Sequence, residues 1–111
     1  MNIKNFIEDW IEASNAFDTD KYLSFFATAA ILEDPSVGRV FNGLEEIRNY
    51  FESYFVGYNT NTKIVQLTIA DKNHAHLEVE FTGTFPEKII GGMFDFTFKD
   101  EKIMNVKADL L

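Results

Sequence analysis

Apolar positions in the first half of the chain recur at helical spacing. From residue 3 to residue 17 they follow the i, i+3, i+4, i+7 pattern of an amphipathic helix, with acidic residues on the opposite face. Asp18 provides a break and an N-cap for a second, short helix that reaches Phe26. Asn42 can cap a third helix, which we expect to end at Gly57. Its inward stripe consists of Leu44, Ile47, Tyr50, Phe51, Tyr54 and Phe55.

After Gly57 the apolar residues alternate with polar ones, a period of two that is typical of strands. Pro35 ends an earlier, short strand because it has no N–H to donate to a neighbouring strand. Helices followed by a strand meander favour an α+β fold with the helices on one face of an antiparallel sheet. The predicted strands are residues 31–33, 39–41, 63–69, 74–84, 93–99 and 103–110.

The length and composition fit one globular domain, which we expect to span residues 1–111. Twelve phenylalanines are enough to build an aromatic core, to line an apolar cavity, or to do both. There is no cysteine, so disulfides and thiolate chemistry are excluded. The formal net charge of -8 repels phosphate backbones and anionic lipids, which argues against nucleic acid and membranes as partners. The N-terminal segment is too acidic for a signal peptide, so we expect a cytoplasmic protein.

One short segment joins the helical half to the strand-rich half. It reads Ile31-Leu32-Glu33-Asp34-Pro35, and Gly43 follows Asp34 by nine positions. With the aromatic positions around it, this segment resembles the SnoaL-like and ketosteroid isomerase-like branch of the nuclear transport factor 2-like superfamily. The resemblance implies a curved antiparallel sheet, wrapped by three N-terminal helices into a cone with an internal pocket, and a homodimer. The other matching positions are Trp10–Phe17, Phe25–Ala27, Ile47, Phe51 and Phe96–Ile103.

Asp34 falls on the position of the general base of ketosteroid isomerases, which moves a proton between carbons beside a carbonyl. The other isomerase groups do not match. The tyrosine that binds the oxyanion falls on Trp10, and the protonated aspartate falls on Phe94. The two supporting tyrosines fall on Phe26 and Phe51. Loss of one oxyanion donor commonly lowers the rate about 100- to 1000-fold, so true steroid isomerase activity is not expected.

Given this fold, the inward faces of the helices and strands define a pocket with mostly apolar walls, as small-molecule sites have. An apolar surround disfavours the charged form of a carboxyl, so we hypothesise that Asp34 exchanges protons near neutral pH as a general base or acid. Two alternatives stay open: Asp34 is a turn residue that bonds nearby backbone N–H groups, and aromatic side chains fill the interior. The expected lining residues are Trp10, Phe26, Asp34, Phe51, Tyr54, Leu77, Val79, Phe81, Phe94, Phe96, Ala108 and Leu110.

A second cluster is weighed as a metal site. His74, His76 and Glu80 have a spacing that is similar to the metal motif of cupins. The helical first half and the lack of a second histidine-bearing motif argue against a cupin. These residues also lie on the strand face that points away from the pocket. We therefore expect no metal, and we interpret the two histidines as a solvated or dimer-facing pair.

The function predicted from the sequence is binding of a small, mostly apolar molecule inside the cone. If the protein is an enzyme, the resemblance implies cofactor-independent proton transfer, as in isomerisation, cyclisation or dehydration. Asp34 is then the base or acid, Trp10 a hydrogen-bond donor and Tyr54 a second polar contact. The alternative is a non-catalytic ligand-binding or dimerisation protein with a packed aromatic interior. No cofactor is expected in either case.

Overall fold

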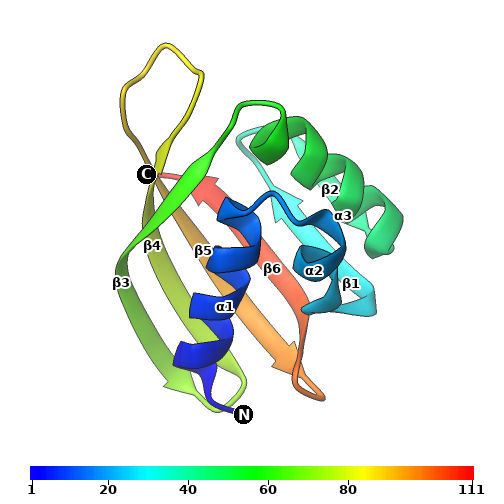
Figure 1. Ribbon diagram of the computed structural model, residues 1–111. Helices are drawn as coiled ribbons and strands as arrows, with labels where there is room; N and C mark the ends of the chain where they lie inside the picture. Colours follow the sequence, from blue (N-terminus) through cyan, green and yellow to red (C-terminus); the bar gives the residue numbers. More distant parts are fainter.

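The computed structural model describes all residues from 1 to 111 and confirms the expected α+β class. Helices dominate the first half, and the last four strands form a meander (Figure 1). No helix is both long enough and apolar enough to cross a membrane. The helices are α1 (Ile3–Asn15), α2 (Thr19–Ser24) and α3 (Gly43–Phe51), and α3 continues into a π-helical turn, η1 (Glu52–Val56). The strands are β1 (Phe26–Asp34), β2 (Arg39–Asn42), β3 (Asn61–Asp71), β4 (His74–Thr82), β5 (Ile90–Lys99) and β6 (Lys102–Leu110).

The six strands form one open sheet in the order β2-β1-β6-β5-β4-β3. Its neighbouring pairs are antiparallel as predicted, except that β1 and β6 run parallel. β1 forms a short antiparallel hairpin with β2, and β6 is the last strand of the antiparallel meander. The two strands meet pointing the same way, so the sheet is mixed rather than wholly antiparallel.

The helices lie on one face of the curved sheet, and the other face is uncovered (Figure 1). α1 begins at the N-cap Asn2, whose side chain accepts a hydrogen bond from the backbone N–H of Asn5. Its apolar stripe faces the sheet, and Ile7 and Trp10 are almost fully buried. The amide side chain of Asn15 exchanges two hydrogen bonds with the backbone of Thr62, which attaches the end of α1 to β3.

The start of β1 differs from the prediction. The sequence placed Phe26 in the second helix because Phe25 and Phe26 continue its apolar pattern. In the structure Phe26 pairs with Ile103 of β6, and the register then shifts before Ile31. Phe26 is buried in the strand, and a helix would bury it equally well, so its apolar character does not distinguish the two structures. The pairing with β6 makes this residue part of a strand.

Gly92 on β5 allows the Phe81 ring to lie directly against the sheet. A methyl group at this position would collide with that ring. We expect Gly92→Ala to lower the free energy of unfolding by about 1–3 kcal/mol, because the ring is forced out of its preferred rotamer. Urea unfolding measures this. Gly91→Ala is the matched control, since its added methyl meets only Leu111 at an ordinary 3.4 Å. Equal stability of both variants would contradict the prediction.

Candidate functional site

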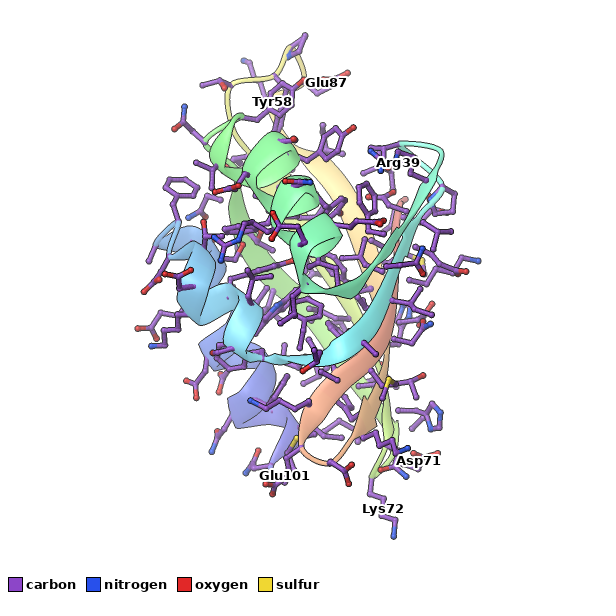
Figure 2. The ribbon with its side chains drawn as sticks, turned by 90° about the vertical axis from the view of Figure 1, so that its right-hand side faces the viewer. Arg39, Tyr58, Asp71, Lys72, Glu87 and Glu101 are labelled. Carbon is purple, nitrogen blue, oxygen red and sulfur yellow. The ribbon has the colours of Figure 1, made fainter.

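A cavity of about 170 Å³ lies between the β1–β2 turn, the end of α3 and the last residues of β6. Ten of its fourteen lining residues are hydrophobic, and six of them carry aromatic rings. The loops around it belong to the end of the molecule that carries Arg39, Tyr58 and Glu87, opposite Asp71 and Glu101 (Figure 2). The lining residues are Asp34, Ser36, Val37, Tyr50, Tyr54, Phe55, Thr60, Phe81, Phe85, Ile90, Phe94, Ala108, Asp109 and Leu110.

Half of the predicted lining residues reach this cavity, and the other half do not. Asp34, Tyr54, Phe81, Phe94, Ala108 and Leu110 line it. The remaining six point inward as predicted but are packed against the helices, so this part of the interior is filled, as one alternative expected. These core residues are Trp10, Phe26, Phe51, Leu77, Val79 and Phe96.

Trp10 is the clearest case of a predicted contact residue that belongs to the core. Its indole packs against the rings of Tyr22, Phe26, Phe94 and Phe96, with centroids 5.2 to 6.5 Å away. The side chain is buried, and its Nε1 atom has no hydrogen-bond partner. Trp10 does not line the cavity, so it is not placed to donate to a molecule there.

Asp34 is the buried acidic residue of the cavity, with 6% of its surface exposed. Ser36 donates both its backbone N–H and its hydroxyl to Oδ1. The Tyr50 hydroxyl donates to Oδ2 at 2.8 Å. Asp34 therefore forms the turn contact that one alternative predicted and also faces the cavity. Three donors, two from Ser36 and one from Tyr50, are directed at the Asp34 carboxyl group.

Tyr50 is a site residue that the pocket prediction missed, although it lies in the predicted inward stripe of α3. It precedes Tyr54 by one helical turn, and their ring centroids are 5.6 Å apart. The helix then ends in the π-helical turn η1, closed by a hydrogen bond from the N–H of Gly57 to the carbonyl of Glu52. This turn directs both Tyr54 and Phe55 at the cavity. Such turns occur frequently at functional sites.

Burial raises the pKa of Tyr22, and burial together with the neighbouring Asp34 carboxylate raises the pKa of Tyr50 well above its usual range. Above about pH 10 the unfolded chain releases these protons while the folded protein retains them. Stability is therefore complete below about pH 10 and falls as the pH rises, by up to about 1.4 kcal/mol per pH unit for each tyrosine. Urea unfolding from about pH 9 to about pH 11 checks this.

Two variants distinguish the contribution of the buried tyrosines to this pH dependence from that of an exposed tyrosine. Tyr22→Phe is expected to reduce the slope of stability against pH by about half. Tyr58→Phe is the control, because Tyr58 is 45% exposed, and this variant is expected to leave the slope unchanged. If Tyr22→Phe leaves the slope of stability against pH unchanged, the pH dependence does not come from the buried Tyr22.

The two histidines lie on the uncovered sheet face, as predicted, but they bond to different acidic residues. Nδ1 of His74 contacts Asp71 at 2.9 Å. Nδ1 of His76 contacts Asp95 at 2.6 Å, and its Nε2 lies 3.5 Å from Glu78. The hydrogen bond with Asp95 raises the pKa of His76. No three histidine or acidic side chains are arranged to hold a metal ion.

A family model of the SnoaL-like domain matches residues 7–106, and the chain belongs to this family. The fold is similar to that of a proposed polyketide cyclase from Sinorhizobium meliloti, with a TM-score of 0.84 and 22% identity, over 94% of this chain and 93% of that one. The salinomycin enzyme SalBIII, which is epoxide hydrolase/cyclase-like and acts in pyran ring formation, also has a TM-score of 0.84, with 20% identity over 97% of this chain and 89% of that one.

A third similar structure is a protein with a ketosteroid isomerase-like fold from Catenulispora acidiphila, solved with trimethylamine. Its TM-score is 0.80, with 16% identity over 93% of this chain and 82% of that one. At these identities the likeness concerns the fold alone. A sequence comparison with curated proteins finds no match.

Proposed function

We propose that this protein binds a small, mostly apolar molecule in the cavity, with Asp34 as its main polar contact. The observation that supports it best is a buried carboxylate facing a cavity whose other walls are mainly hydrophobic. A volume of about 170 Å³ also limits the ligand. An apolar cavity of about 150 Å³ holds benzene, whereas sites for drug-sized ligands measure about 300–1,000 Å³. The expected ligand is the size of a substituted benzene and smaller than a steroid.

A thermal-shift screen with small aromatic and carbonyl compounds tests this proposal. A ligand at about 100 times its Kd adds about 2.7 kcal/mol, or roughly ten degrees for a domain of this size. Ala108→Leu fills part of the cavity and is expected to abolish the shift. Ala29→Leu is the control, because Ala29 is exposed on β1 and is not a lining residue. If the ligand still binds to Ala108→Leu, the binding site is not this cavity.

Proton transfer by Asp34 is the second candidate, and the free lone pair on its Oδ2 favours it. Tyr54 supplies the one lining hydroxyl that makes no hydrogen bond within the protein, so it is available to a substrate oxygen. The test follows deuterium exchange beside the carbonyl of a small cyclic ketone in D₂O by NMR. Exchange that Asp34→Asn reduces by about 100-fold or more establishes a general base. If a ketone binds but its exchange is not accelerated, the protein binds small molecules without catalysing proton transfer.

A homodimer is part of the same proposal. The sheet face opposite the helices carries half-buried polar residues, among them His76, Glu78 and Thr97, and no element covers it (Figure 1). We expect a second copy to pack there. Sedimentation at tens of micromolar is expected to give the mass of a dimer, and Thr97→Arg to shift it to a monomer because it places a charge in the contact. A wild-type monomer at that concentration contradicts this prediction.

A further inference from the structure

The polar groups of the cavity present mainly acceptors, and only the Tyr54 hydroxyl has a free proton to donate. Of the four lining hydroxyls, three already donate their protons within the protein. Ser36 and Tyr50 donate to Asp34, and Thr60 donates to the carbonyl of Tyr54. The oxygens of these three groups can then only accept, and the Tyr54 hydroxyl is the one lining group that keeps a free proton. A ligand group with several N–H or O–H donors complements them better than a carbonyl or a carboxylate does.

The cavity also carries negative charge without a positive partner. Asp34 and Asp109 both line it, and none of the ten lysines and arginines does. The strand register places Arg39 opposite Asp34, but its guanidinium lies over the Phe41 ring, 4.6 Å from the centroid, and forms no ion pair with Asp34. A buried carboxylate without a counter-ion is a costly arrangement, which a bound cation relieves.

Aromatic faces complete the same pattern. The rings of Tyr54, Tyr50, Phe55, Phe81 and Phe94 form a continuous series around the cavity, with successive centroids 5.6 to 6.1 Å apart. The face of an aromatic ring attracts a cation within about 6 Å, and the attraction is strongest when water is excluded. The net charge of -8 raises the concentration of cations at the surface as well.

We propose that the ligand of this cavity is a small protonated amine with an aliphatic body, held by Asp34 and the surrounding rings. This inference rests on the proposed binding function and adds the charge of the ligand. The ammonium donates to the free lone pair of the Asp34 Oδ2 atom. The aliphatic part occupies the apolar walls formed by Phe81, Phe94 and Ala108.

Two compounds of the same shape test the charge. Neopentylamine and neopentyl alcohol share their carbon skeleton and number of heavy atoms, but only the amine is positively charged at neutral pH. Titration calorimetry with each is expected to show the amine binding at least about tenfold more tightly, as a desolvated cation–π contact and a carboxylate together require. Raising the ionic strength is expected to weaken the binding of the amine and to leave the binding of the alcohol unchanged.

Two charge variants locate the effect. Asp34→Asn keeps the shape of the side chain and is expected to remove the preference for the amine. Glu101→Gln removes one negative charge at the opposite end of the molecule and is expected to retain it (Figure 2). If Asp34→Asn does not fold, the comparison of the two compounds on the wild type still decides.

The outcomes separate this inference from the proposed function. Equal affinity for the alcohol and the amine overturns the cationic ligand and leaves the apolar binding site standing. Binding of neither compound up to its solubility limit overturns both proposals. The third outcome is that Asp34→Asn keeps the preference for the amine and Glu101→Gln loses it. The preference then comes from the overall surface charge, and the amine site at Asp34 is overturned.

Discussion

Replacing Trp10 by alanine is expected to lower the free energy of unfolding by about 3–5 kcal/mol. The indole is 2% exposed and contacts four other aromatic rings, contributed by α2, β1 and β5. Its removal deletes the apolar surface that joins α1 to the sheet and leaves a cavity that rigid neighbours do not close. Domains of this size are stable by only about 5–15 kcal/mol, so this one change removes a large share.

Urea unfolding of wild type and Trp10→Ala measures the loss. Phe17→Ala is the matched aromatic control, because Phe17 is 37% exposed and makes no aromatic pair. We expect the control to lose less than about 1 kcal/mol. A Trp10→Ala protein whose stability equals that of the control would show that the ring does not join the helix to the sheet in solution.

The periodicity of the chain predicted most of the fold. The helical stripe of α1 and the alternation of β4 and β5 identify the buried faces correctly, because each pattern depends only on neighbouring residues. In β6 the predicted inward Ala108 is buried, but the predicted inward Leu110 is 48% exposed. The parallel pairing of β1 with β6 was not predicted. It joins Phe26 to Ile103, far apart in the sequence, and no local pattern encodes which strands meet at that distance.

The site was predicted less completely than the fold. The sequence proposed Asp34 as a site residue, and the structure places it beside the cavity, while Leu77 and Val79 are buried as their inward positions predicted. Whether an inward side chain meets a cavity or another side chain depends on the volume that the helices fill, and periodicity carries no information on volume. The hydrogen bond between Tyr50 and Asp34 links a helix to a strand end, so neither segment indicates it alone.

That hydrogen bond is expected to be among the strongest single polar contacts of the protein. Tyr50→Phe removes the donor and leaves the buried Asp34 Oδ2 atom without its partner. We expect a loss of about 1.5–3 kcal/mol, the range for hydrogen bonds to charged groups. Asp34→Asn is expected to be destabilising as well, because the neutral amide accepts more weakly from both Tyr50 and Ser36.

A double-mutant cycle isolates the contact from the other effects of each change. Stability is measured by urea unfolding for Tyr50→Phe, Asp34→Asn and the double variant, and we expect a coupling free energy of about 1 kcal/mol or more. Tyr54→Phe is the control, because the Tyr54 hydroxyl has no partner within the protein and its loss is expected to change stability by less than about 0.5 kcal/mol. Additive effects of Tyr50→Phe and Asp34→Asn would mean that the two groups do not bond in solution. The Tyr50 hydroxyl would then be a second free donor in the cavity beside that of Tyr54, and the predominance of acceptors on which the amine inference depends would be lost.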